Sequence, residues 1–372
     1  MCVTSALFAF LSRKIKTVKF QSRRHAVNLE RCLTLILVLC MAFIAAFRED
    51  SVGIDTPSYQ EIYMTVGAAH SYSAGLRSVD MTGFLYILLC RILYHFSKTP
   101  HTITFFTSLI VNAELYLLVR RVSWNSVTIL YLWQVLLFFP FSMNGNRQTI
   151  AMLLMLHACL SLYRNFRAPL AWGLVVLAVG VHPSMLCMTP LLFSGVAARK
   201  IGDKRIGFCL SACAGAAAYK GMFSAANLIV RFYPHYAQYV SGENTIFSTN
   251  GRGRIIYLYM FFLGLMFLWC FQKRRPNERQ SAVFQMYPAL TAMLVFGTFS
   301  TQSMIVSRVV LCYMSALLFL IPDLLDRLKG FHRFFARIII MSLLFLYYMI
   351  SLLENQNGVT PYALHWAVRH AP

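Results

Sequence analysis

Long apolar runs recur along the whole chain and alternate with short polar segments. Apolar runs of roughly 17 to 25 residues are typical of transmembrane helices. The pattern predicts an all-α polytopic membrane protein with about eleven transmembrane helices. The predicted spans are 31–47, 101–119, 124–142, 147–163, 168–181, 185–198, 205–220, 254–272, 282–300, 304–322 and 336–353.

The apolar stretch from 168 to 198 is interrupted by His182, Pro183 and Ser184. Proline lacks a backbone donor and disfavours helix at the residue that precedes it. We expect two short or broken helices that meet at a polar corner. A single kinked span is the alternative.

The apolar segment 82–97 carries Arg91 in its middle. As a membrane span it would bury a charge, which is costly, whereas an interfacial helix lets the arginine reach water. If the segment lies flat on the outer face, most of the 34 Lys and Arg residues fall on the inner side, as the positive-inside rule requires. We therefore predict an interfacial helix near 82–97.

This topology places the N-terminus inside and the C-terminus outside. It predicts one transmembrane domain over 31–372, preceded by a cytoplasmic basic arm at 1–30. The polar segments expected on the outer face are the loops 48–100 and 221–253 and the tail 354–372.

Composition agrees with a membrane location, because 58% of the residues are hydrophobic and only 13% are charged. The net charge of +21 comes from short basic clusters between apolar runs, so we expect no nucleic-acid partner. The ten cysteines lie almost all inside apolar runs without a Cys-x-x-Cys motif, which indicates buried small side chains. We expect neither a metal ion nor a cofactor.

Motifs for nucleotide hydrolysis and serine hydrolysis are missing from the sequence. It contains no Gly-rich Walker loop, no dinucleotide fingerprint and no Gly-x-Ser-x-Gly elbow. A site on the outer face would also lack a nucleotide supply. A sugar donor there must be activated in another way, for example as a lipid pyrophosphate.

Several arginines lie singly beside the outer ends of predicted spans. Guanidinium groups bind phosphate through two parallel hydrogen bonds, so together these residues suit an anionic lipid headgroup such as a pyrophosphate. Each one alone is explained as an interfacial anchor that snorkels to water. The arginines in question are Arg48, Arg147, Arg252, Arg254 and Arg308.

Other outer residues carry groups suited to sugar chemistry. His182 could take a proton from a hydroxyl, or it could bond to helix-end carbonyls. Asp55 could orient a base or bind sugar hydroxyls, or it could cap a turn. Tyr59 and Tyr63 lie one helical turn apart and could stack on sugar rings or form part of an aromatic belt.

Five short motifs occur in an order that covers nearly the whole chain. The motifs are Arg48 with Gly53, Asp55, Thr56, Tyr59 and Tyr63; Asn144 or Asn146 with Arg147 and Gln148; His182-Pro183-Ser184; Ser307-Arg308 with Tyr313; and Pro361-Tyr362. Their order resembles the EpsG family of Wzy-type polysaccharide polymerases. One spacing departs from the family form, because Glu49, Asp50 and Ser51 lengthen the interval from Arg48 to Gly53.

The resemblance implies a membrane glycosyltransferase of C-type architecture in the bacterial inner (cytoplasmic) membrane. Such an enzyme joins undecaprenyl-pyrophosphate-linked oligosaccharide repeat units at the periplasmic face in O-antigen, capsule or exopolysaccharide synthesis. Membrane lipid and a chain-length regulator are the further partners that the resemblance implies.

The resemblance also implies roles for individual residues. Arg147 and Arg308, with Arg48 as a further candidate, would hold the pyrophosphate and stabilise its leaving charge. His182 or Asp55 would deprotonate the acceptor hydroxyl. The residues expected to bind substrate are Tyr59, Tyr63, Asn144, Asn146, Gln148, Ser184, Arg252, Arg254 and Tyr362.

Two other classes of protein fit part of the pattern. A lipid-linked oligosaccharide flippase or transporter would also need basic residues, but along a cavity in the middle of the membrane. A membrane acyltransferase that modifies a surface glycan would place its key histidine near the inner face. The predicted gathering of polar residues at one outer face disfavours both.

Overall fold

A computed structural model describes residues 23–79, 83–122, 126–232, 254–273, 280–299, 304–355 and 357–365. Over these residues the secondary structure is helical, apart from one isolated β-bridge between Arg48 and Leu364. The helices are α2 (Arg23–Ala46), α3 (Thr56–Ala68), α4 (Tyr72–Ser78), α5 (Phe84–Phe96), α6 (His101–Arg121), α7 (Ser126–Val135), α8 (Phe138–Asn144), α9 (Asn146–Leu162), α10 (Pro169–Val181), the 3-10 helix η1 (Pro183–Met188), α11 (Thr189–Ile201), α12 (Lys204–Phe232), α14 (Arg254–Phe271), α15 (Ala282–Phe299), α16 (Met304–Met314), α17 (Leu317–Arg327) and α18 (Gly330–Leu353).

The chain divides into two compact units. The first unit comprises residues 1–158, 168–186 and 328–372. The second unit comprises residues 159–167 and 187–327. Each unit is described by itself below.

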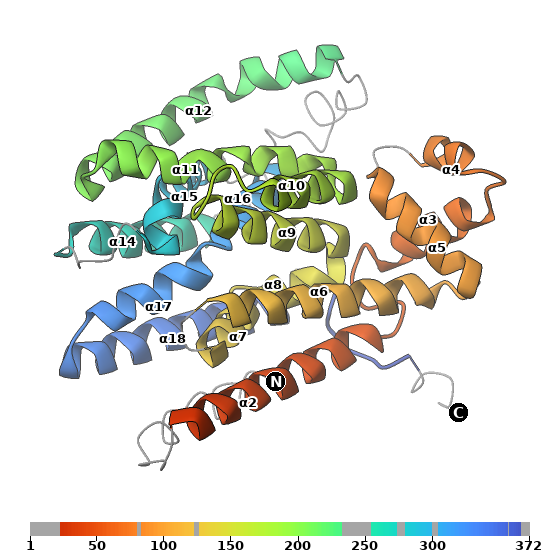
Figure 1. The fold of residues 1–372 in the computed structure, drawn as a ribbon, viewed down its shortest axis with the longest axis horizontal. Helices are drawn as coiled ribbons and strands as arrows, with labels where there is room; N and C mark the ends of the chain where they lie inside the picture. Colours follow the sequence, from red (N-terminus) through yellow and green to blue (C-terminus); the bar gives the residue numbers. More distant parts are fainter. Residues whose placement is uncertain are drawn as a thin grey trace. The chain divides into compact units, whose positions relative to one another are not determined.

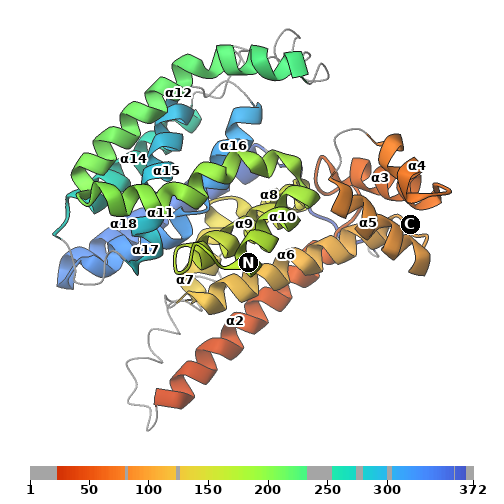
Figure 2. The same cartoon turned by 45° about the horizontal axis from the view of Figure 1, so that its top comes forward.

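In the first unit, α2 and α6 run side by side, which Figures 1 and 2 both show. Helices α3, α4 and α5 form a neighbouring cluster, and the buried side chains of Tyr63, Tyr86 and Ile87 contribute to its apolar core. Helix α10 packs against α5, and α7 packs against α18. The Tyr131 hydroxyl of α7 donates to the Met341 carbonyl of α18 at 3.0 Å.

In the second unit, α11, α12, α14, α16 and α17 all pack against α15. Glycine permits the close approach of the α12 and α15 backbones. A Cβ at Gly215 of α12 would lie 2.2 Å from the Ala292 carbonyl oxygen of α15. Pro288 lies inside α15, and the next residue, Ala289, donates its N–H to the Ser194 hydroxyl of α11 at 3.2 Å.

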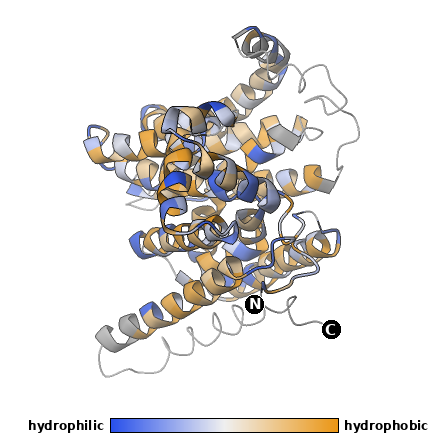
Figure 3. Cartoon of the chain, turned by 90° about the vertical axis from the view of Figure 1, so that its right-hand side faces the viewer, coloured by the Kyte–Doolittle hydropathy of each residue, from blue (hydrophilic) through white to orange (hydrophobic). Residues whose placement is uncertain are grey.

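Several helices are long and apolar enough to cross a membrane. Four pass this test among the described residues, namely Leu29–Ala46 of α2, α6, α15 and α18. The count rises to six if the bent pairs α7 with α8 and α16 with α17 each form one span. Hydrophobic residues dominate the helices in Figure 3. These observations agree with a multi-pass membrane protein, and the count of eleven spans is not confirmed.

Two predicted spans are broken rather than continuous. The span 124–142 bends by 59° between α7 and α8, and the span 304–322 bends by 43° between α16 and α17. At the first break Leu137 adopts a left-handed conformation with φ of 66°. Pro140 marks the first break, because proline cannot donate to the carbonyl four residues earlier, that of Leu136, and its ring clashes with that carbonyl. The second break, at Ser315 and Ala316, contains neither glycine nor proline.

Helix α12 is longer than predicted. It continues to Phe232, whereas the predicted span ended at residue 220 and a loop was expected over 221–253. No proline occurs in this stretch before Pro234, so nothing in the local sequence stops the helix. Residues 233–253 lie outside the described part of the chain.

The polar corner at His182 is confirmed, because α10 ends at Val181 and η1 follows before α11 begins. Helix α5 has 13 residues and is about 20 Å long, less than the hydrocarbon core requires. Arg91 does not rely on water alone. Its guanidinium donates to the carbonyls of Val66, Ala69 and Ser71, at and beyond the end of α3.

Candidate functional site

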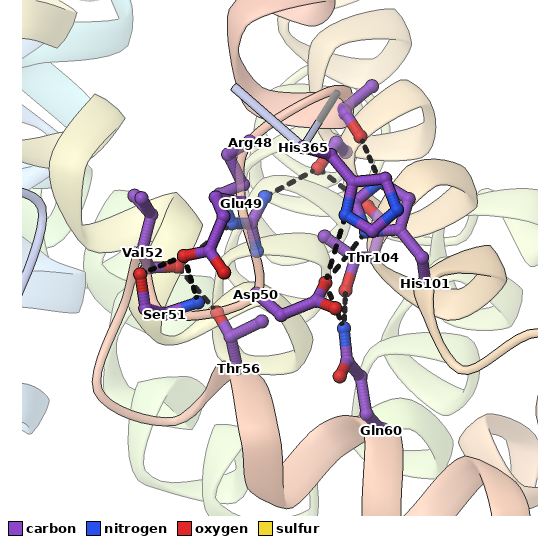
Figure 4. A network of polar contacts seen from close by, with 12 residues as sticks. Arg48, Glu49, Asp50, Ser51, Val52, Thr56, Gln60, His101, Thr104 and His365 are labelled. Atoms are coloured by element: carbon purple, nitrogen blue, oxygen red, sulfur yellow. Dashed lines mark hydrogen bonds and ion pairs between the residues drawn. The ribbon is translucent and has the colours of Figure 1, made fainter. Parts of the chain in front are cut away.

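Arg48 is the anchor of the polar segment that follows α2 (Figure 4). Its Nη1 donates to the Ala45 carbonyl at 2.5 Å and to the Ser108 hydroxyl at 2.9 Å. Its Nη2 donates to the Met143 carbonyl at 2.9 Å, and its Nε donates to the Val52 carbonyl at 3.2 Å. One guanidinium thus joins α2, its following loop, α6 and α8.

The Arg48 side chain is completely buried. Burial lowers the pKa of Arg48 to about 10, so the guanidinium still carries its charge at neutral pH. Its partners are carbonyls and a hydroxyl, which satisfy the donors of a buried cation. These contacts favour a positioning role for Arg48 over a role in holding a pyrophosphate.

The C-terminal tail pairs with this segment. The Glu49 N–H donates to the Ala363 carbonyl at 2.9 Å, and the His365 N–H donates to the Phe47 carbonyl at 3.0 Å. The Tyr362 hydroxyl donates to the Ile44 carbonyl of α2. The loop after α2 and the tail, which the sequence places on one face, are therefore in direct contact.

Arg147 lies in the first turn of α9 and is only half-buried. Its guanidinium carbon lies 5.1 Å from the ring centroids of both Tyr59 and Tyr86. Its Nε atom is buried without a hydrogen-bond partner, and the guanidinium donates no hydrogen bond to any residue in the described ranges. Two aromatic faces thus hold the guanidinium, and its N–H groups make no hydrogen bond to the described residues.

The amides around Arg147 are buried. The Asn144 Oδ1 accepts the backbone N–H of Asp55 at 2.8 Å. The Asn146 Nδ2 donates to the Thr107 hydroxyl at 3.0 Å, whereas its Oδ1 has no partner among the described residues. Gln148 is also buried. Asn144 thus ties the loop to the end of α8, two residues before α9 begins.

Asp55 occupies the N-cap position of α3 and is partly buried. Tyr59 and Tyr63 are buried within the same helix. The Tyr63 hydroxyl donates to the Ser97 carbonyl at 2.5 Å, which favours packing over sugar stacking. The Tyr59 ring faces Arg147 and also meets the Tyr86 ring edge-on, so it helps to build the arginine's surroundings.

His182 caps the end of α10, where its N–H donates to the Ala178 carbonyl. Its Nδ1 lies 3.3 Å from the Ser184 hydroxyl. A Cβ at Gly83 would lie 2.3 Å from the carbonyl oxygens of Gly180 and Val181. Glycine therefore lets the chain at His182 approach the start of α5, three residues before Tyr86.

The remaining predicted residues divide between the second unit and the undescribed parts. Arg308 belongs to α16 in the second unit, where it is partly buried. The Tyr313 hydroxyl of the same helix donates to the Cys187 carbonyl at 2.6 Å. Arg252 and the side chain of Arg254 lie outside the described residues.

A cluster of Asp50, His101 and His365 was not predicted (Figure 4). The Asp50 Oδ1 lies 2.8 Å from the His101 Nδ1 and 3.9 Å from the His365 Nδ1. Burial raises the pKa of Asp50, but hydrogen bonds from His101 and Gln60 outweigh it, and the net shift is downward. The ordinary spacing rules could not find this cluster, because its three residues lie far apart along the chain.

Tyr86 was also missed. It lies in the predicted interfacial helix, where an aromatic residue needs no special explanation. Its role depends on which arginine faces it, and that is set by how α3, α5 and α9 pack. The sequence contains a weak signal in the match between Arg147 and tyrosines, but no rule selects Tyr86 from the chain's 19 tyrosines.

Comparison with known proteins supplies the family. The EpsG family matches residues 31–364. This range includes all five motifs of the sequence analysis and leaves out the N-terminal arm. The comparisons with curated proteins and with solved structures found no significant match. The chain therefore belongs to the EpsG family, which is linked to exopolysaccharide synthesis.

Proposed function

We propose that this protein is a polysaccharide polymerase of the bacterial inner membrane. It transfers a growing glycan from undecaprenyl pyrophosphate to the next lipid-linked repeat unit at the periplasmic face. Membership of the EpsG family supports this proposal. The structural observation that carries it is Arg147, a charged side chain held by aromatic rings with its donors unspent.

The surroundings of Arg147 suit a diphosphate. Cation–π contacts fix the plane of the guanidinium without using its N–H groups. The side chain also lies at the N-terminus of α9, where the helix dipole favours negative charge. A planar fork with free donors can grip phosphate oxygens through two parallel hydrogen bonds.

The reaction needs one bond to form and one to break. The acceptor hydroxyl oxygen attacks the anomeric carbon of the donor sugar, and the bond from that carbon to the pyrophosphate oxygen breaks. Undecaprenyl pyrophosphate leaves with the bonding electrons, and Arg147 stabilises the negative charge that develops on it. The hydroxyl proton passes to a general base.

His182 is our choice for the base. If its Nδ1–H donates to Ser184, the lone pair lies on Nε2, which is the tautomer that a base requires. Asp55 is the alternative, since it lies in the loop that Asn144 ties to the end of α8, just before α9. Arg308 stays a prediction from the family resemblance.

The decisive experiment is polymerisation by the purified protein in nanodiscs, using lipid-linked repeat units isolated from a strain that lacks the gene. We expect the wild type to form a ladder of glycan lengths. Arg147→Ala should lower the rate by about 10²- to 10³-fold, as loss of a transition-state donor does elsewhere. Arg147→Lys should fail similarly, because lysine cannot supply the planar fork.

Arg77→Ala is the matched control, because Arg77 is an exposed arginine of α4 in the same unit. It should leave the ladder unchanged. A normal ladder from Arg147→Ala would remove Arg147 from the mechanism. If the wild type forms no ladder but moves lipid-linked units across vesicle membranes, the transporter alternative is correct. Arg308→Ala, tested in parallel, decides the role of that residue.

A further inference from the structure

We propose that Asp50, His101 and His365 bind one divalent transition-metal ion, Zn²⁺ by preference, which fastens the C-terminal tail to the loop after α2. Each residue offers one ligand atom, and these atoms all lie within 4.8 Å of one another. The three side chains are partly buried (Figure 4). This inference departs from the sequence-based expectation of no metal, and it does not depend on the proposed polymerase activity.

His101 has the orientation of a metal ligand. Its Nε2 lies 2.9 Å from the Ala46 carbonyl, which can only accept a hydrogen bond, so Nε2 carries a proton. Its Nδ1 lies 2.8 Å from the Asp50 Oδ1, which is also an acceptor. A positive species must lie between these two atoms, either a proton or a metal ion. A backbone carbonyl behind the outer nitrogen is the usual support for a metal-bound histidine.

The other two ligands are also held in place by contacts of their own. Gln60 Nε2 donates to the Asp50 Oδ1 at 2.7 Å and lies 3.3 Å from the Thr104 hydroxyl. His365 is fixed by its backbone bond to Phe47, and its ring stacks on His101 with centroids 4.2 Å apart. The three ligands therefore come from three chain segments that the fold brings together.

The ligand set and its spacing select the type of ion. Two imidazoles with one carboxylate suit Zn²⁺ and its first-row neighbours, whereas Mg²⁺ and Ca²⁺ prefer oxygen ligands. Ligands about 2.0–2.1 Å from a tetrahedral Zn²⁺ lie about 3.3 Å from one another. The observed separations from Asp50, 2.8 and 3.9 Å, lie on either side of that value. In the proposed site, rotation of the His365 ring out of its stack on His101 would bring the three ligand atoms to three corners of the tetrahedron.

The test measures bound metal on the full chain, purified in detergent through an affinity tag that contains no histidine. The protein is dialysed against Zn²⁺, and unbound metal is then removed. We expect elemental mass spectrometry to find one zinc ion per chain. Cobalt(II) in its place should give the visible absorption of a tetrahedral site. Asp50→Asn and His365→Asn should each lower metal affinity by at least about tenfold.

His70→Asn is the matched control, because His70 is an exposed histidine outside the cluster in the same unit. It should bind one zinc ion like the wild type. His365 lies in the tail, so its variant tests the site with little risk to the helices. A second readout is limited proteolysis, in which Zn²⁺ should protect the tail at least tenfold relative to a chelator.

Three results would overturn the proposal. They are no stoichiometric metal in the folded wild type, metal that stays bound in both Asp50→Asn and His365→Asn, and tail protection that is identical with Zn²⁺ and with the chelator. The last result would mean that a protonated histidine, rather than a metal ion, bridges to Asp50. None of these readouts involves glycan, so their failure leaves the proposed polymerase untouched.

Discussion

Two arginines of the first unit lie in contrasting surroundings. Around Arg48, four acceptors from Ala45, Val52, Ser108 and Met143 receive the guanidinium, and the side chain is completely buried. Around Arg147, two tyrosine rings hold the guanidinium, and it donates no hydrogen bond to the described residues. We name these surroundings the Arg48 socket and the Arg147 socket.

The difference shows how one residue type serves two purposes. Hydrogen bonds to backbone carbonyls fix Arg48 but leave it nothing to offer a ligand. Aromatic faces fix Arg147 and leave its N–H groups for an incoming anion. The two sockets are linked along the chain, because the Met143 carbonyl that accepts from Arg48 belongs to α8, which ends just before α9 and Arg147. The Arg48 socket thus helps to fix the position at which α9 begins.

Replacing Arg48 should give the largest effect on stability. Arg48→Ala removes four buried hydrogen bonds from a charged donor and leaves a cavity where the side chain was, so we expect a loss of more than about 3 kcal/mol. Little folded protein should survive detergent extraction, as measured by fluorescence-detected size exclusion. Arg77→Ala should extract normally. A folded Arg48→Ala protein that only lacks polymerisation would make the two sockets functionally alike.

A substitution at Gly53 can strain the backbone of the loop in the Arg48 socket while the arginine itself is unchanged. Gly53 has φ of +94°, and a Cβ there would lie 2.6 Å from the Met143 carbonyl oxygen. We expect Gly53→Ala to destabilise the protein by more than about 2 kcal/mol. Gly202 is the control, since its φ is +75° but no described atom lies within 4 Å of a Cβ. Gly202→Ala should cost about 1–2 kcal/mol. Equal melting temperatures for both variants would contradict the close approach.

Replacing Tyr86 of the Arg147 socket should have a smaller effect, seen mainly in activity. Tyr86→Leu removes one aromatic face, and a cation–π contact is worth about 0.5–2 kcal/mol, so polymerisation should fall roughly 3- to 30-fold. Tyr86→Phe keeps the face and should stay close to wild type. The measurement is the initial rate of ladder formation with the lipid-linked unit. If both variants lose activity equally, the hydroxyl rather than the ring face matters.

Much of the fold is visible in the sequence because hydrophobic length is a local property. Each predicted span coincides with one helix or with a pair of short helices, and Pro183 marks the corner after α10. The break near Leu137 had a signal in Pro140, which disrupts helix four residues earlier, but the predicted span ran through it. The break near Ser315 was not predictable, since no glycine or proline marks it. There, packing against neighbouring helices decides where a helix ends, and a single sequence does not contain that information.

Some of the predicted site residues lie together in the structure, although the sequence did not show their contacts. Arg48, Asn144 and Asp55 do come together, as the motif order implied. The different surroundings of Arg48 and Arg147 were not predictable, because the sequence does not show whether carbonyls or tyrosine rings face a given arginine. His101 and Asp50 were overlooked for the same reason, since they are 51 positions apart in the chain and meet only after folding.

The pairing of the tail with the loop after α2 has a consequence for synthesis. Residues 47–49 find their backbone partners in 363–365, almost the entire length of the polypeptide away. While the ribosome is still making the helices between them, residues 47–49 cannot form these backbone hydrogen bonds. We infer that the region around Arg48 completes its folding only after residues 363–365 have been made.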